Sequence, residues 1–269
     1  MKLSLTFGKR LWLLVLLMIL GLAVAAGLGA LLRLVLAGNA TAALRISAVA
    51  QNLLAFVIPA AVAALMVTRL PAELLAIRRG PQWGGLLLSL GIIVVSVPAI
   101  NCVTQACGLL PWPDSVLETE AAAEAAVTTM MGGPTVPDLI VDLLIIGLLT
   151  GLGEELFFRG ALQRLLLSRP MSIHAAVWIA AGLFSLMHGQ PVGFVSRMLL
   201  GAMMGYIAAW TASTWTAVAA HAMNNSLVVL VVWAGWNPDF VGLDTPLLSA
   251  LSAVATLAGM WLLRRLSQG

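Results

Sequence analysis

The sequence contains few charged residues and few cysteines. Only 9% of its 269 residues are charged, whereas soluble domains carry about a quarter. This composition excludes an ordinary soluble protein and, with 61% hydrophobic residues, predicts an integral membrane protein. Cys102 and Cys107 stand five positions apart in an apolar segment, which fits neither a disulfide framework nor a metal-binding cysteine cluster. We expect both to be packing residues.

A basic surface of the kind that binds nucleic acid is also missing. The net charge is +3, but the basic residues are scattered at the ends of apolar segments and do not gather on one face. They are therefore interpreted as signals of membrane topology, and the lipid bilayer is the expected partner.

Apolar runs fill most of the chain. A membrane-spanning helix needs about 20 apolar residues, so the length allows about eight spans and almost no soluble domain. The expected spans cover residues 11–36, 46–68, 83–109, 136–167, 173–188, 194–212, 215–233 and 247–263. This pattern predicts an all-α, polytopic bundle of about eight transmembrane helices, forming a single transmembrane domain over residues 1–269. A cleaved signal peptide has a shorter apolar core, so the first span is expected to be retained, although Ala25 and Ala26 leave cleavage as an alternative.

Residues 114–131 have a different character, because they carry four acidic residues and no Lys or Arg. This pattern predicts a short interfacial helix outside the bilayer, a solvated connector in preference to a binding element. Acidic residues also occur in 239–244, whereas Lys and Arg gather at both termini and in the loops after the second and fourth spans. By the positive-inside rule both termini are expected to be cytoplasmic.

Ionisable residues inside spans are costly, and each is a functional candidate unless it lies at an interface or is paired. Asp138 and Asp142 lie in the first turns of the fourth span, where a helix N-terminus favours carboxylates, so we interpret them as structural. Arg197 is expected to pair with one of them or to snorkel. His174 is expected to be interfacial.

Glu154 and Glu155 stand far from either end of the fourth span. Residues four apart share a helix face, whereas neighbours project about 100° apart. Glu155 therefore aligns with Arg159, and Glu154 does not. This spacing predicts an internal Glu155–Arg159 ion pair that leaves Glu154 as the reactive carboxylate facing the bundle interior.

The same spacing joins Phe184 to His188 and His221 to Asn225. With Glu154, these side chains place a carboxylate, two imidazoles and a carboxamide on three different spans, where they can converge on one water-holding cavity. The alternative is a polar network that only holds helices together.

Two pairs of glycines accompany these spans. Gly147 with Gly151, and Gly201 with Gly205, have the small-xxx-small spacing that lets membrane helices approach closely. We expect close helix contacts at both pairs.

Three motifs carry a family resemblance. They are E-E-L-F-F-R-G at 154–160, F-S-L-M-H at 184–188 and H-A-M-N-N at 221–225. In order and in placement on successive spans they resemble the CAAX-protease and bacteriocin-processing (CPBP, or Abi) family of intramembrane glutamic or metalloproteases. The resemblance implies a protease core over about 138–233. It assigns catalytic roles to Glu154, His188, His221 and Asn225, and supporting roles to Glu155, Arg159 and Phe184.

The mechanism that the resemblance implies is open between two schemes. In one, Glu154 is the general base, His188 helps to hold the water, and His221 with Asn225 donates to the oxyanion. In the other, Glu154, His188 and His221 bind zinc, whose bound water is a much stronger acid. No His-Glu-x-x-His pair argues for zinc, and we favour the metal-free scheme, with the cavity open to the cytoplasmic side.

The expected activity is that of an intramembrane endopeptidase acting on a membrane-anchored protein or peptide. Prokaryotic members of the family serve in peptide maturation, immunity and cleavage of membrane-anchored tails, so the bacterial plasma membrane is the expected location. The alternative is a non-enzymatic membrane protein, either a proton-coupled transporter or a bacteriocin-immunity type scaffold.

Overall fold

The computed structural model describes residues 5–237 and 241–268. Every regular element within these residues is a helix. Lys2, from the expected basic N-terminus, and Asp239, from the expected acidic segment, lie outside the described residues.

In the described part of the chain, six helices are long and apolar enough to cross a membrane, and two apolar helices are shorter. The six are α1 (Phe7–Val35), the composite helix α2–η1–α3 (Ala40–Val67), α5 (Trp83–Gly108), the composite helix α7–η2–α8–η3–α9 (Val136–Leu167), α12 (Thr214–Trp233) and α13 (Pro246–Leu266). The shorter two are α10 (Ile173–Leu186) and α11 (Phe194–Trp210). These eight helices coincide with the eight expected spans, so the prediction of an all-α, polytopic membrane bundle is confirmed.

The two composite helices alternate ordinary α-helix with wider π-helical turns. Their parts are α2 (Ala40–Gln51), η1 (Asn52–Val57), α3 (Ile58–Val67), α7 (Val136–Asp142), η2 (Leu143–Leu149), α8 (Thr150–Glu155), η3 (Leu156–Gln163) and α9 (Arg164–Leu167). A single turn, α4 (Pro71–Leu74), follows α3. Because π-helical turns are frequent at functional sites, the position of η3 directly after Glu155 is informative.

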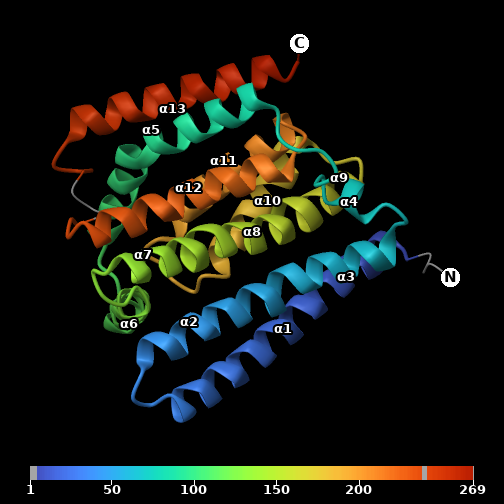
Figure 1. Cartoon of the computed structure of the whole chain (residues 1–269). Helices are drawn as coiled ribbons and strands as arrows, with labels where there is room; N and C mark the ends of the chain where they lie inside the picture. Colours follow the sequence, from blue (N-terminus) through green and yellow to red (C-terminus); the bar gives the residue numbers. More distant parts are fainter. Residues whose placement is uncertain (1–4, 238–240, 269) are drawn as a thin grey trace.

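The helices form three groups side by side. Figure 1 shows α1 with α2–α3 at one edge of the bundle, α5 with α13 at the opposite edge, and the composite helix α7–α9 between them with α10, α11 and α12. Buried apolar side chains join the first group to the middle one through η1, η3 and α10. A second buried cluster joins α5 and α13 to α11 and α12.

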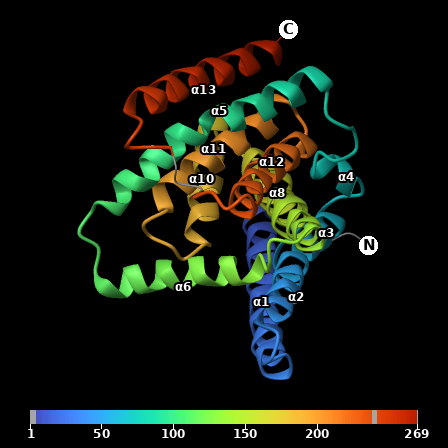
Figure 2. The ribbon, with the colours of Figure 1, turned by 60° about the vertical axis from the view of Figure 1, so that its left-hand side comes forward.

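The bundle has two distinct ends. At one of them, the termini end, α1 begins and α13 stops (Figure 1). At the other, the α6 end, lies α6 (Asp114–Met130), which is seen end-on in Figure 1 and lengthwise in Figure 2. It therefore runs across the axis of the bundle, as expected for an interfacial helix.

The expected close helix contacts at the glycine pairs are present. On η2 and α8, Gly147 and Gly151 face α12, where a Cβ on Gly151 would lie 3.0 Å from the backbone nitrogen of Ala222. On α11, Gly201 and Gly205 face α10. Both contacts hold the middle group at short range, because backbone atoms approach positions that have no side chain.

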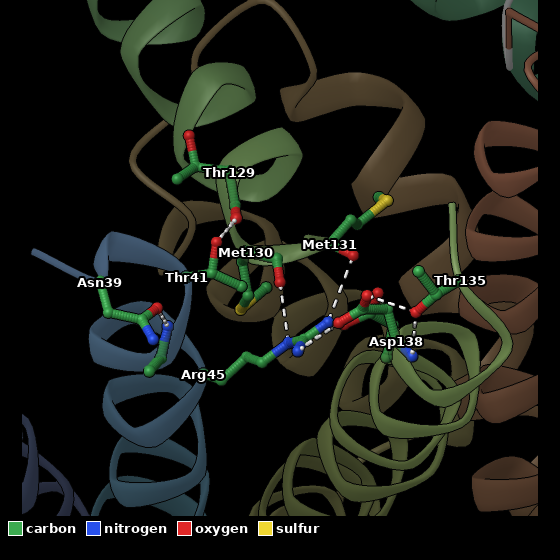
Figure 3. Close-up of polar contacts among 10 residues, drawn as sticks. Asn39, Thr41, Arg45, Thr129, Met130, Met131, Thr135 and Asp138 are labelled. Carbon is green, nitrogen blue, oxygen red and sulfur yellow. Dashed lines mark hydrogen bonds and ion pairs between the residues drawn. The ribbon is translucent and has the colours of Figure 1, made fainter. Parts of the chain in front are cut away.

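Of the two alternatives expected for Arg197, pairing with one of the aspartates of the fourth span is wrong. Arg45 of α2, and not Arg197, binds them, with its Nη1 2.9 Å from Oδ1 of Asp138 (Figure 3). Its Nη2 lies 2.8 Å from Oδ1 of Asp142. Its Nε also donates to the carbonyl of Met130 at 3.0 Å. Sequence spacing gives no information on this pairing, because Arg45 and the aspartates lie on different helices.

Arg45 and the neighbouring Thr41, both on α2, also fix the C-terminal end of α6. Thr41 of α2 donates to the carbonyl of Thr129 at 2.8 Å (Figure 3). The interfacial helix is thus fastened to α2 at one end, which a freely solvated connector would not be.

The glycine contact generates a stability prediction. We expect Gly151→Ala to lower the melting temperature of the purified protein, because the atoms facing the new methyl group are backbone atoms of α12 that cannot rotate away. Overpacking of this kind costs about 1–3 kcal/mol. The control is Gly91→Ala on α5, where nothing lies within 4 Å of a new Cβ. Equal melting temperatures for the two variants would contradict the close contact.

Candidate active site

Glu154 and Glu155 lie at the end of α8, at the centre of the bundle. Both are buried, at 8% and 0% exposure. Oε1 of Glu155 accepts a hydrogen bond from Nη1 of Arg159 at 2.7 Å, and neither side chain of this pair is exposed. The ion pair predicted from the four-residue spacing is present.

Glu155 has a second partner that the sequence did not indicate. Its Oε1 lies 2.8 Å from Nδ1 of His221 on α12. A carboxylate only accepts hydrogen bonds, so the proton of this bond is on Nδ1 of the ring. In the neutral imidazole this leaves Nε2 as an acceptor.

Nε2 of the same ring is directed toward Glu154. It lies 3.8 Å from Oε2 of Glu154, which is longer than a hydrogen bond. This Oε2 is buried and has no hydrogen-bond partner within residues 5–237 and 241–268. The imidazole of His221 therefore stands between the two carboxylates, bonded to Glu155 and adjacent to Glu154.

Arg159 connects this group to α11. Its Nη2 donates to the carbonyl of Gly201 at 2.7 Å. One turn further, Nε2 of Gln163 donates to the carbonyl of Gly205 at 2.9 Å. The guanidinium carbon of Arg159 also lies 4.8 Å from the centre of the Phe184 ring. Gly201 and Gly205 thus pack closely against α10, and their backbone carbonyls accept hydrogen bonds from η3.

Phe184 contacts both histidines. Its ring centre lies 4.9 Å from that of His188 and 5.9 Å from that of His221, both in edge-to-face arrangements. Nδ1 of His188 donates to the carbonyl of Phe184 at 2.9 Å, because a carbonyl can only accept. His188 is exposed and lies just past the last residue of α10, Leu186.

Asn225 lies one turn beyond His221, as the four-residue spacing predicted. Its Nδ2 donates to the carbonyl of Ile146 at 3.0 Å, which ties α12 to η2. Its Oδ1 accepts from Nδ2 of Asn224 at 3.2 Å. One N–H of Asn225 is left for another acceptor. Asn224 was not among the residues predicted from the sequence, although the doubled asparagine was the available signal.

A cavity of about 170 Å³ brings most of these residues together. Its lining comes from α10, α11, α12 and the loop after α10, and consists of Phe184, His188, Arg197, Leu200, Gly201, Met204, His221, Asn224 and Asn225. Three of the four predicted catalytic residues line it. Glu154 does not, but it stands behind His221 at the distance given above.

Arg197, which was expected to pair with an aspartate or to snorkel, contributes a cation to the cavity wall. Its Nη1 donates to the carbonyl of Gln190 at 3.0 Å, and its Nη2 donates to Oε1 of the same residue at 2.8 Å. Gln190 in turn donates to Glu120 of α6 at 2.9 Å, and the backbone nitrogen of Val192 donates to the other oxygen of Glu120 at 2.8 Å. The interfacial helix α6 therefore holds the loop that carries His188.

The residues proposed for zinc are not gathered as a ligand set. Among the described residues, no three His, Cys, Asp or Glu side chains are grouped so that they could hold a metal ion. Of the proposed ligands Glu154, His188 and His221, the first and last are neighbours, while the Phe184 ring contacts both histidines. The arrangement as it stands does not fit a metal centre.

The comparison with protein families bears on this same segment. The family described as type II CAAX prenyl endopeptidase, Rce1-like, matches residues 136–227. This segment is therefore similar to that family. The expected family resemblance is thereby confirmed, over about a third of the chain. No curated protein and no solved structure matches the chain. The Rce1-like segment begins with the first residue of α7 and includes Glu154, His188, His221 and Asn225.

The buried ion pair gives a second prediction. We expect Arg159→Met to destabilise the protein strongly, by about 3–5 kcal/mol, because it leaves the buried carboxylate of Glu155 without its cation. The double variant Glu155→Gln/Arg159→Met should regain part of this loss, because no buried charge is left unpaired. Thermal unfolding in detergent measures both effects.

The matched control for this prediction is Arg164→Met, at a partly buried position on α9, which should change the melting temperature much less. If Arg159→Met melts at the wild-type temperature, or if the double variant is less stable than the single one, the buried pair does not have the role described.

Proposed function

We propose that this protein is an intramembrane endopeptidase, in which Glu154 activates a water molecule that attacks a peptide bond of a membrane-associated protein or peptide. The observation that carries the proposal is the placement of His221. One of its nitrogens is fixed by Glu155 at 2.8 Å and the other lies 3.8 Å from the unpaired oxygen of Glu154, beside a cavity. The Rce1-like description of residues 136–227 supports the same class of reaction.

The reaction begins when water bound at Glu154 loses a proton to the carboxylate and its oxygen attacks the carbonyl carbon of the substrate. The π electrons of that carbonyl move to its oxygen, which becomes the oxyanion of a tetrahedral intermediate. The oxyanion then collapses, the C–N bond breaks, and Glu154 returns the proton to the departing amine. The carboxylate thus serves first as general base and then as general acid.

His221 orients this chemistry. With Nδ1 held by Glu155, its Nε2 is available beside Glu154, where it can accept a hydrogen bond from the attacking water. This revises the initial hypothesis, because a neutral ring with its proton on Nδ1 cannot donate from Nε2 to an oxyanion. In the proposed mechanism that donation falls to the remaining N–H of Asn225.

Asn225 and His188 have complementary roles in the proposed site. The Asn225 carboxamide is fixed by Ile146 on one side and Asn224 on the other, so its free N–H is oriented before substrate binds, which is the condition for oxyanion stabilisation. His188 has its proton on Nδ1, so the Nε2 of its neutral ring can accept a hydrogen bond from water or from a substrate N–H. No step of this mechanism involves a metal.

The third prediction concerns Glu154. We expect Glu154→Gln to keep the wild-type melting temperature within a few degrees and to reduce cleavage by about 10²–10⁴-fold, the usual contribution of a general base. The readout is quantitative mass spectrometry of membrane peptides in cells that express either form. Substrates should accumulate uncut only with the variant. Glu118→Gln, on the exposed side of α6, is the control and should cleave normally.

A cleavage assay on the purified protein, with a substrate peptide identified in this way, separates the two initial schemes. Chelators should leave the activity of the purified protein unchanged. Loss of activity on chelation, restored by zinc, would contradict the metal-free mechanism.

The fourth prediction distinguishes a protease from a proton-coupled transporter. Asn225→Ala should reduce cleavage by about 10²–10³-fold, because an oxyanion donor is lost. A transporter that relays protons through Glu154 and the histidines should tolerate loss of this amide far better than loss of Glu154. Proton uptake by reconstituted vesicles that survives Asn225→Ala, with no peptide cut by the wild type, would overturn the proposal. A scaffold would keep its phenotype with Glu154→Gln.

A further inference from the structure

Burial along the middle helices changes at the level of the site. In the composite helix, every residue from Gly153 to Gln163 is buried, whereas Gly147 is the only buried residue between Leu143 and Thr150. The change occurs one residue before Glu154. The buried part of the composite helix extends toward the termini end, because α9 follows it there. The less buried part extends toward α6 (Figure 1).

The other two helices around the cavity change at the same level. On α12, most residues from Thr214 to His221 are buried, but none from Ala222 to Val228 is. On α11, burial is dense from Gly201 onward, and only Ser196 is buried between the start of the helix and Leu200. On three helices, therefore, the buried stretch lies on the termini side of Glu154 and His221.

The helices of the α10–α11 hairpin are shorter than the hydrocarbon core is thick. At a rise of about 1.5 Å per residue, the 14 residues of α10 extend about 21 Å and the 17 residues of α11 about 26 Å, whereas the hydrocarbon core is about 30 Å thick. The loop between them carries His188, and Glu120 of α6 holds it. Arg197 and Asn225, which line the cavity, lie on the α6 side of these buried stretches.

The two ends of the bundle also differ in charge. The termini end carries Lys9, Arg10, Arg69, Arg78, Arg79, Arg164, Arg169, Arg264 and Arg265, together with the acidic Glu73, which pairs with Arg78. The α6 end carries the acidic residues of α6 together with Asp138, Asp142 and Asp244, and its basic residues are Arg33, Arg45 and Arg197. Arg45 is neutralised by two aspartates. By the positive-inside rule, the termini end faces the cytoplasm and the α6 end faces away from it.

From these two asymmetries we infer that the site receives its substrate from the α6 end, which is the extracytoplasmic face of the membrane. The inference rests on the proposed function and adds the substrate class. The substrate is an exported or membrane-anchored chain whose scissile bond is presented from outside the cytoplasm. Entry from the α6 end replaces the initial expectation of a cavity open to the cytoplasmic side.

The depth of the site adds a requirement on the substrate. From His221 to the last residue of α12, Trp233, the helix rises about 18 Å. An extended chain covers about 3.3 Å per residue, so about five or six residues must be unwound between the membrane surface and the scissile bond. A stable transmembrane helix does not meet this requirement, whereas a flexible tail or a frayed end of an anchor does.

Cysteine accessibility tests the direction of entry without any need for a substrate. The background is Cys102→Ala/Cys107→Ser, which removes both native thiols. In it, Leu200→Cys places a thiol in the cavity wall. Ser115→Cys marks the exposed face of α6, and Gly80→Cys marks the exposed loop at the termini end. A charged, membrane-impermeant maleimide is applied to intact cells and to inverted vesicles.

We expect Leu200→Cys and Ser115→Cys to react in intact cells, at least tenfold faster than Gly80→Cys, and the order to reverse in inverted vesicles. Reaction of Leu200→Cys from the Gly80→Cys side overturns the inference, as does reaction of Ser115→Cys only in inverted vesicles. A Leu200→Cys thiol that reacts only after denaturation also overturns it, because the cavity would then be closed. Asn224→Cys, which also lines the cavity and is partly exposed, replaces Leu200→Cys if that variant does not fold.

The result does not depend on catalysis. The same labelling pattern is expected in a Glu154→Gln background, so a failure of the proposed activity would leave the direction of entry standing. Conversely, active protein with labelling from the termini side would refute only the direction.

Discussion

The shared carboxylate of Glu155 is the interaction on which the rest of the site depends. One oxygen accepts from both Arg159 and His221, inside a part of the bundle where its side chain is fully buried. A buried carboxylate is costly unless it is paired and hydrogen-bonded, and here both partners come from defined positions on η3 and α12. Through the bond from Arg159 to Gly201, the same group reaches α11. Three helices are thereby held in one register around the cavity.

This fixed arrangement of the three helices also explains why the adjacent glutamates have different roles. Glu155 is inaccessible and its Oε1 accepts two hydrogen bonds, whereas Oε2 of Glu155 and Oε2 of Glu154 have no hydrogen-bond partner within the described residues. The close contact at Gly151 brings α12 near α8, and the close contact at Gly201 brings α10 near α11, so that short side chains of these helices can meet. A larger separation would let lipid or water reach Glu155 and would weaken the electrostatic interactions that orient His221.

Sequence periodicity predicted the parts of this structure that lie within single helices. The fourth span was expected over 136–167 and occupies those residues, and the Glu155–Arg159 pair followed from spacing alone. Partners on different helices were missed, because they depend on the rotation and axial offset of packed helices. Thus Asp142 binds Arg45 and not Arg197, and His221 binds Glu155. Asn224 and the Glu120 contact to the α10–α11 loop were unseen for the same reason.

The most direct test of the central claim is the protonation of the His221 ring. The chain has three histidines, so ¹⁵N-histidine NMR of the protein in lipid nanodiscs can be assigned with single substitutions of His174 and His188. The account predicts that His221 carries its proton on Nδ1, and that Glu155→Gln shifts this resonance while Glu118→Gln does not. A neutral His221 ring with its proton on Nε2 and a bare Nδ1 would contradict the account.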